Sequence, residues 1–259
     1  MKKISAWDLL YSGIKLNFLQ ASWNFERLQN AGFLFSIMNI LKKIYGKGTP
    51  EMAAAMKRHI SFFNTHIFFS SAALGVIARL EEDISNQEPA AKEREIENTK
   101  MGIMGPLAAI GDSLFWSGIK PFALLIGVVI VMLGGTQRPG LWIWAAAAAF
   151  FLYNLPRVAI KYFLLFKAYY QHQALFGLIQ KIKFQDILRS IKITGMGVLG
   201  MFAGIYAVTD EYYIASHFVD SLLLAFVFFV TVSVLKRKVS VSRILMILMT
   251  VCIIIAYIF

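Results

Sequence analysis

The first 48 residues alternate apolar and polar positions with the period of an amphipathic helix. Apolar side chains recur at steps of three and four on one predicted face: Trp7, Leu10, Tyr11, Ile14, Phe18, Ala21, Phe25 and Leu28. Ser5, with Asp8 three positions later, has the pattern of a capping box that starts a helix. A second stretch, Phe33 to Tyr45, is followed by Gly46, a frequent helix terminator. Residues 1–48 are therefore predicted to form amphipathic helices that lie in a membrane interface or pack on a partner.

Residues 49–117 place polar side chains inside apolar sequence. The segment from 59 to 80 is mostly apolar but has three polar residues near its middle: Asn64, Thr65 and His66. Basic residues flank both of its ends, which favours a re-entrant hairpin with both ends in the cytoplasm over a span. Residues 79–100 are strongly polar and are expected to form an aqueous loop with some helix. A Gly-rich segment at 101–116, interrupted by Asp112, is predicted to be a broken helix.

Residues 118–259 form the predicted transmembrane helical region. Its apolar runs are 118–135, 141–166, 193–208, 218–235 and 244–259. Several are shorter than the ~20 residues of a straight span, as in transporters with thin spans and broken helices. The second run is interrupted by Asn154, Pro156 and Arg157, so a kink or break is expected there.

The distribution of Lys and Arg predicts the topology. Loops 167–192 and 236–243 are rich in both residues and are expected in the cytoplasm, whereas the turn at 209–217 has acids and no Lys or Arg. About five crossings satisfy this pattern, with the N-terminus in the cytoplasm and Phe259 outside. The start of the chain does not have the uninterrupted apolar stretch of a secretory signal peptide.

Composition agrees with an all-α integral membrane protein. Hydrophobic residues make up 58% of the 259 residues and charged residues 16%, which excludes a disordered chain and disfavours a soluble enzyme. The formal net charge is +11, but the Lys and Arg residues do not form a dense stripe that could bind the phosphates of a nucleic acid. Nucleic acid is therefore not an expected partner. The lone Cys252 excludes an internal disulfide and a cysteine-based metal cluster.

Candidate chemistry is confined to polar groups at predicted membrane depth. No catalytic motif is present, and the four scattered histidines predict neither a metal site nor a cofactor. Asp112 is either a functional acid or the cap of a half-helix, and His66 is either a ligand-binding or a structural histidine. Polar side chains within the membrane need a polar partner or water. The segments 59–80 and 101–116 are therefore predicted to meet around a cavity for a sugar-like ligand. The predicted binding residues are Asn64, Thr65, His66, Asp112, Ser113 and Trp116.

Three stretches resemble one family of membrane proteins. They are Asn24 to Phe33 (NFERLQNAGF), Phe62 to His66 (FFNTH) and Gly105 to Trp116 (GPLAAIGDSLFW). They are similar to the IID component of the mannose-family sugar phosphotransferase permeases, which handle mannose, fructose, sorbose or N-acetylgalactosamine, and the similarity spans nearly the whole chain. The sequence departs from the family at Ile67, where proline is common, and at Ala109, where glycine is common.

The resemblance implies one IID domain that works as a subunit in the bacterial cell membrane. Such a chain pairs with a IIC membrane subunit, as a heterodimer that assembles into a trimer of heterodimers, and forms with it the sugar pathway. Separate IIA and IIB proteins carry phosphoryl groups on the cytoplasmic side, and the IID chain is neither phosphorylated nor an enzyme by itself. The residues leave two alternatives open: an autonomous ion-coupled carrier and an intramembrane enzyme.

Overall fold

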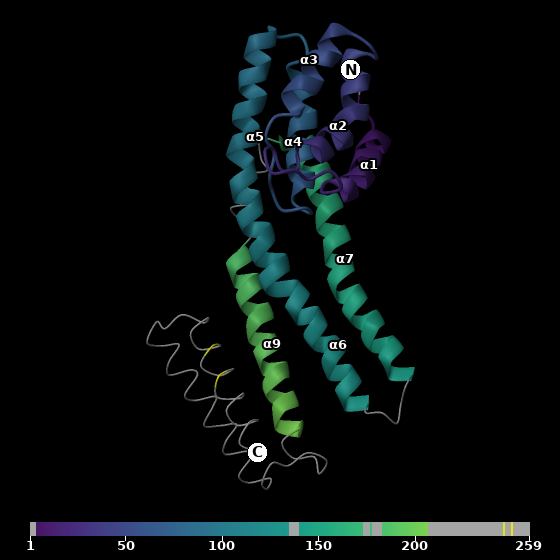
Figure 1. Ribbon diagram of the computed structural model, residues 1–259, viewed down its shortest axis with the longest axis vertical. Helices are drawn as coiled ribbons and strands as arrows, with labels where there is room; N and C mark the ends of the chain where they lie inside the picture. The colour runs from purple at the N-terminus through teal and green to yellow at the C-terminus, as the bar shows by residue number, and fades with distance from the viewer. Residues whose placement is uncertain are drawn as a thin grey trace. The chain divides into compact units, whose positions relative to one another are not determined.

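The computed structural model describes residues 4–134, 140–172, 177, 183–206, 246 and 250. The regular elements in these ranges are helices, accompanied by isolated β-bridges (Figure 1). The chain divides into two compact units, Met1–Met196 and Gly197–Phe259, and the helix α9 (Phe184–Tyr206) begins in the first and ends in the second. The predicted runs at 218–235 and 244–259 lie outside the described residues except for Met246 and Thr250. The predicted turn at 209–217, the basic loop at 236–243 and Cys252 lie outside them as well.

The start of the first helix and the end of the second coincide with the predicted signals. The helix α1 (Ala6–Lys15) starts with the predicted capping box: the Ser5 N–H donates to Asp8 Oδ2 at 2.8 Å, and Ser5 Oγ accepts from the Asp8 N–H at 3.3 Å. The helix α2 (Asn30–Tyr45) ends at Gly46, whose φ of 86° suits a glycine. The helix α3 (Pro50–His59) follows after a short turn.

The prediction of one continuous helical face through Leu28 is wrong about the length of the helix. Regular α-helix ends at Lys15, a 3₁₀ turn covers Leu16–Phe18, and the chain then turns irregularly until α2. The face itself is exposed, with Trp7 at 79% and Phe25 at 92%, in agreement with the prediction that it meets a membrane interface or a partner. The opposite side packs inward instead, with Leu9, Ser12, Gly13, Leu16 and Leu19 buried. Periodicity identifies an apolar face but does not say whether that face meets the chain's own core or another surface.

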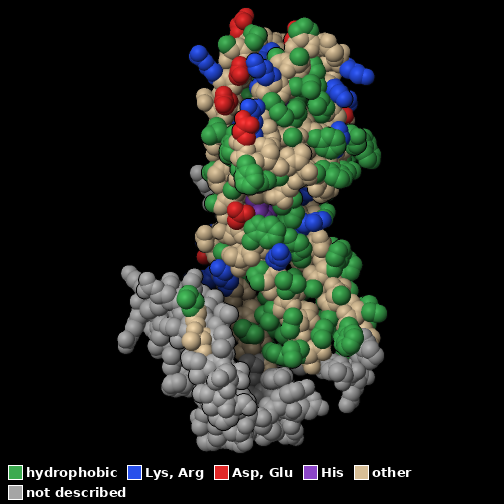
Figure 2. Space-filling view, in the orientation of Figure 1, with side chains coloured by type: hydrophobic (Ala, Val, Ile, Leu, Met, Phe, Trp, Pro, Cys, Tyr) green, Lys and Arg blue, Asp and Glu red, His purple; other side chains and the backbone are tan. Residues whose placement is uncertain are grey.

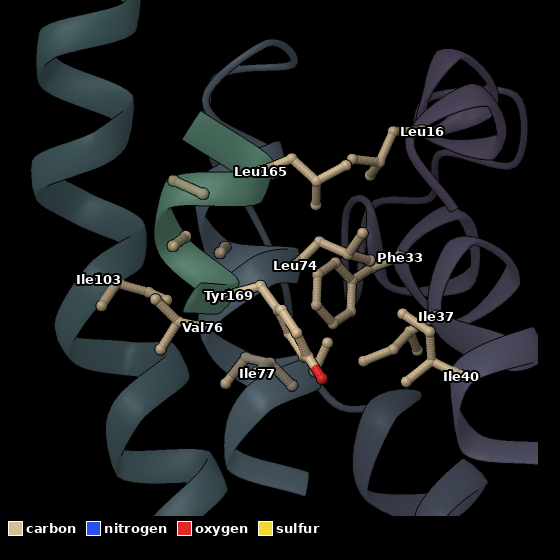
Figure 3. Packing of buried hydrophobic residues seen from close by; sticks show 14 of the residues in the cluster. Leu16, Phe33, Ile37, Ile40, Leu74, Val76, Ile77, Ile103, Leu165 and Tyr169 are labelled. Atoms are coloured by element: carbon tan, nitrogen blue, oxygen red, sulfur yellow. The ribbon is translucent and has the colours of Figure 1, made fainter. Parts of the chain in front are cut away.

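The helix α4 (Ser70–Asp83) is the centre of the first unit and packs against α2, α5 (Pro89–Gly111) and α7 (Gly140–Tyr170). Figure 3 shows the surrounding apolar packing, in which Leu74, Val76 and Ile77 of α4 lie among side chains of the neighbouring helices. Gly75 permits a close approach to α7, because a Cβ there would lie 2.5 Å from the Leu165 carbonyl oxygen. The predicted hairpin at 59–80 is therefore an irregular segment, 60–69, followed by a buried helix.

The predicted break at 101–116 is replaced by a change of helical winding. The helix α5 passes into a π-helical stretch, Asp112–Ile119, and then into α6 (Lys120–Gly134) without interruption. The predicted aqueous loop at 79–100 is also wrong for most of its length, because α5 already begins at Pro89. The helix α7 likewise continues through Pro156, where a break was among the expected outcomes. Neighbouring helices and side chains can satisfy backbone groups that proline leaves free, so a helix can continue through it.

Two of the described helices are long and apolar enough to cross a membrane: Pro89–Met132 and Gly140–Tyr170. Figure 2 shows charged side chains gathered over the N-terminal helices and the start of α5, while α6 and the start of α7 present mostly hydrophobic side chains. Aromatic residues such as Trp142, Trp144 and Phe150 are at least half exposed there. Such a surface suits lipid, and the all-helical architecture agrees with the predicted class of membrane protein.

A buried carboxylate ties α2, α3 and α4 together. Glu81 of α4 is fully buried and accepts hydrogen bonds from Arg58 Nε at 2.7 Å, the Tyr45 hydroxyl at 2.5 Å and His59 Nε2 at 2.6 Å. Burial lowers the pKa of His59, while its hydrogen bond to Glu81 acts in the opposite direction. Burial by itself raises the pKa of Glu81, but the hydrogen bonds from His59 and Arg58 outweigh it and lower the pKa to about 2. The prediction that residues 79–100 form an aqueous loop is therefore wrong for Glu81, which is buried.

The substitution Glu81→Gln is expected to destabilise the protein strongly. It keeps the shape of the side chain but leaves the buried guanidinium of Arg58 without a counter-charge, which costs about 3–5 kcal/mol. Because the pKa of Glu81 is lowered on folding, its stabilisation is full above the unfolded-state pKa and is lost as the pH falls toward about 2. Thermal unfolding in detergent measures both effects. The control Asp83→Asn removes a partly exposed pair with Arg79 and should cost about 1 kcal/mol or less, and equal shifts for the two variants would contradict the expectation.

Candidate functional site

The irregular segment 60–69 is held by main-chain pairing with the residues before α2. The Gln29 N–H donates to the Phe63 carbonyl at 2.8 Å, and the Phe63 N–H donates to the Arg27 carbonyl at 3.3 Å. Leu28 lies between them in the left-handed region, with φ 54°. These contacts make a short parallel bridge, so two of the stretches that carry the family resemblance lie side by side.

The same segment packs against α5 and the start of the π-helical stretch. The Thr65 hydroxyl donates to the Met104 carbonyl at 3.0 Å, and the Asn64 N–H donates to Met104 Sδ at 3.2 Å. The His66 side chain lies directly on Gly111, where a Cβ would collide with the imidazole. The predicted meeting of the 59–80 and 101–116 segments is therefore present in the structure.

His66 is buried among aromatic rings and has an unpaired donor. Its ring stacks on Phe115 with a centroid distance of 5.3 Å and an interplanar angle of 14°, and Phe68 and Trp116 approach its edges. His66 Nδ1 accepts a hydrogen bond from the Phe68 N–H at 3.3 Å, which places the proton of a neutral imidazole on Nε2. His66 is 3% exposed, and its Nε2 has no hydrogen-bond partner among the described residues.

The remaining predicted residues lie nearby with different exposures. Asp112 immediately follows the glycine under His66 and is exposed in the first turn of the π-helical stretch, so it does not cap a broken helix. Trp116, one turn on, is 47% exposed. Ser113 is half-buried and lines a cavity of about 130 Å³ with Phe184 and Leu188 of α9. The structure thus brings the ring centroids of His66 and Trp116 within 5.9 Å of each other and places Asp112 next to the glycine under His66. Asn64, by contrast, is exposed.

Two cations border this aromatic cluster and were missed by the sequence reasoning. The Arg157 guanidinium lies over the Phe68 ring at 5.2 Å, and Lys120 Nζ lies over the Trp116 ring at 4.7 Å. Arg157 had been noted only as an interruption of an apolar run, because nothing in the sequence places α7 beside residue 68. Within the described ranges, no group of three His, Cys, Asp or Glu residues could hold a metal ion.

Known proteins similar to this chain come from one family. The family model described as the phosphotransferase system (PTS) mannose/fructose/sorbose family IID component matches residues 3–259. The PTS mannose-specific EIID component of Escherichia coli K12 is 36% identical over 162 residues, which are 62% of this chain and 54% of that protein. The fructose permease IID component of Bacillus subtilis 168 is 31% identical over 199 residues, covering 77% of this chain and 69% of the relative. The chain thus aligns with little more than half the length of the E. coli relative.

Solved structures agree over nearly the full length. A chain in the cryo-EM structure of the mannose transporter ManYZ with microcin E492 is 27% identical, with a TM-score of 0.56 and coverage of 98% of this chain and 96% of that one. A chain described as "Structure of membrane protein" is 26% identical, with a TM-score of 0.72 and coverage of 97% and 96%. The resemblance found in the sequence is confirmed: the chain is an all-helical membrane protein that belongs to the mannose/fructose/sorbose family of IID components of the sugar phosphotransferase system.

Proposed function

We propose that this chain forms, together with a IIC membrane subunit, the pathway by which a hexose or amino sugar enters a bacterial cell. In this proposal IIB phosphorylates the sugar on entry and IIA supplies IIB, both on the cytoplasmic side of the membrane. The IID chain itself carries no phosphoryl group and catalyses no step. The names of the relatives, which refer to mannose, fructose and sorbose permeases, support a sugar as the ligand.

The unpaired donor of His66 carries the proposal. A buried N–H without an acceptor costs about 1–3 kcal/mol, and a ligand hydroxyl that accepts from it would remove this cost. The exposed Asp112 carboxylate, one residue beyond the glycine under His66, can accept from a second hydroxyl. The half-exposed ring of Trp116 can lie under the apolar face of a sugar. Together these groups match a ligand that has both hydroxyls and an apolar face.

The exposed apolar face of α1 and the turns after it supports a partner-dependent subunit. Large side chains there, including Trp7 and Phe25, are exposed rather than packed into the core of the described residues. A IIC subunit or the membrane interface would cover them, in keeping with the proposed heterodimer and its trimer. An autonomous ion-coupled carrier would need paired acids at membrane depth, whereas Asp112 is the one acid between Lys100 and Asp186. An intramembrane enzyme would need a nucleophile and a base within reach of each other.

The proposed topology has about five crossings, with the N-terminus in the cytoplasm and the C-terminus outside. The segment 60–69 does not cross the membrane in this arrangement, and α4 returns buried inside the protein. Burial of the irregular backbone between α5 and the residues before α2 is what such a segment requires at membrane depth.

Expression of this chain without a IIC subunit is expected to give no saturable sugar uptake in proteoliposomes. The reason is that one chain supplies only part of the pathway and leaves an apolar face uncovered. Co-expression with a IIC subunit should yield a co-purifying complex and, with IIA and IIB, phosphorylated sugar inside the vesicles. Saturable uptake by the chain alone would contradict the assignment.

The substitution Asp112→Asn is expected to weaken sugar binding by the purified IIC–IID complex about tenfold or more. The change keeps the size of the side chain but removes the charge that strengthens a hydrogen bond to a hydroxyl. Equilibrium binding of radiolabelled mannose, fructose and sorbose measures the effect. The matched control Glu51→Gln removes an exposed carboxylate in the first turn of α3 and should leave binding unchanged. Wild-type affinity in Asp112→Asn would place the sugar elsewhere.

Fusion of a reporter that is active only outside the cytoplasm tests the topology. A fusion after Phe259 should be active, and a fusion within 181–192 should be silent, because this range, which includes the start of α9, is rich in Lys and Arg. Matched fusions to a reporter that is active only in the cytoplasm should give the opposite pattern. An active external reporter at 181–192 would overturn the five-crossing arrangement.

A further inference from the structure

Two buried amide side chains of the stretch from Asn24 to Asn30, those of Gln29 and Asn30, bond to the segment that carries His66. Asn30 is 4% exposed, and its Nδ2 donates to the Ile60 carbonyl at 2.7 Å. Asn24 Nδ2 in turn donates to Asn30 Oδ1 at 3.0 Å. None of these amides reaches His66 or the aromatic cluster around it, so this stretch acts on the proposed sugar site through the backbone of residues 60–66.

Gln29 makes the contact closest to the site. Its backbone N–H pairs with Phe63, after which the chain turns into α2 and can offer no further strand-like backbone. The side chain continues the pairing instead: Nε2 donates to the Thr65 carbonyl at 2.9 Å, and Oε1 accepts from the Thr65 N–H at 3.0 Å. Gln29 is 3% exposed, so one buried amide satisfies both main-chain polar groups of Thr65.

Thr65 is thereby fixed from two sides. Gln29 holds its backbone, and its own hydroxyl donates to the Met104 carbonyl of α5. The next residue is His66, which packs onto Gly111 with no room for a Cβ between them. A shift of the Thr65 backbone would therefore move the imidazole relative to Phe115, Trp116 and the neighbouring Asp112.

We propose that Gln29 is a positioning residue for the sugar site, holding Thr65 so that the unpaired Nε2 of His66 is presented to the ligand. Gln29 does not touch the sugar. This role rests on the proposed function, because it presumes that His66 binds the ligand. An amide is required because Thr65 presents a donor and an acceptor together, and a carboxylate can serve only the donor.

The substitution Gln29→Glu gives a reversible test. An ionised carboxylate would accept from the Thr65 N–H but repel the Thr65 carbonyl, whereas the protonated acid has the same donor and acceptor as glutamine. Burial next to a carbonyl raises the pKa of a carboxyl group, so the protonated form prevails at acidic pH. A merely structural residue would change complex stability, but it would not make sugar affinity recover on acidification.

The experiment measures equilibrium binding of radiolabelled mannose, fructose and sorbose to the intact IIC–IID complex between about pH 5 and about pH 9. Relative to wild type at each pH, Gln29→Glu should bind about tenfold more weakly at the alkaline end and nearly normally at the acidic end. Gln29→Met, which is similar in length but has no amide, should bind weakly throughout. The exposed residue Gln20 offers a matched control, and Gln20→Glu should follow the wild type. The wild-type profile accounts for other groups near the segment, including His59, His66 and Lys100.

His66→Ala, measured in parallel, separates the two proposals. Loss of binding in His66→Ala with normal binding in both Gln29 variants would overturn the positioning role and leave the sugar site intact. Normal binding in His66→Ala would overturn the sugar site and, with it, this role of Gln29. An equal loss at both ends of the pH range in Gln29→Glu would contradict the positioning role, and so would failure of both Gln29 variants to assemble with IIC at any pH.

Discussion

The carboxylate of Glu81 is charged and has no access to water, and the helices around it are arranged to satisfy that charge. Its hydrogen bonds come from Tyr45 at the end of α2 and from Arg58 and His59 at the end of α3. An ion pair of this kind contributes less net stability than its geometry suggests, because both groups lose their hydration. The ion pair nevertheless favours one packing of α2, α3 and α4, because any other packing of these helices leaves a buried charge unpaired. The irregular segment that carries Thr65 and His66 starts directly after this junction and leads into the helix that bears Glu81.

The proposed site depends on contacts between parts of the chain that are far apart in the sequence. Residues 27–29 fix the backbone of the segment, α5 accepts the Thr65 hydroxyl, and the start of the π-helical stretch supplies the ring on which His66 stacks. Short π-helical stretches are frequent at functional sites, where the wider turn changes the direction of side chains. Here that stretch contains Asp112, Ser113 and Trp116, three of the residues predicted to bind the ligand.

Local signals in the sequence predicted local structure well. The capping box at Ser5 and the stop at Gly46 depend only on neighbouring residues, and both are present in the structure. The meeting of the two polar segments was predictable too, because polar groups in apolar surroundings need each other or water. Two features depend on tertiary context and were not predictable: the burial of Glu81 and the continuity of the helix through Gly111. A glutamate in a charged run has no mark that distinguishes a buried partner of Arg58 from a solvated neighbour. The amide of Gln29 acts through residues 36 positions away, which no local pattern reveals.

The π-helical stretch also sets the phase between the two halves of a single helix. Each residue of an α-helix advances the direction of the side chains by about 100°, so one residue more or fewer in the stretch turns everything beyond it by roughly that angle. The side of α5 that faces Thr65 and the side of α6 that packs on α7 are thus related by the winding of Asp112–Ile119. Deletion of one residue within that stretch would keep every side chain of α6 and yet direct a different face of it toward α7. The number of residues in the π-helical stretch therefore determines which face of α6 is directed toward α7.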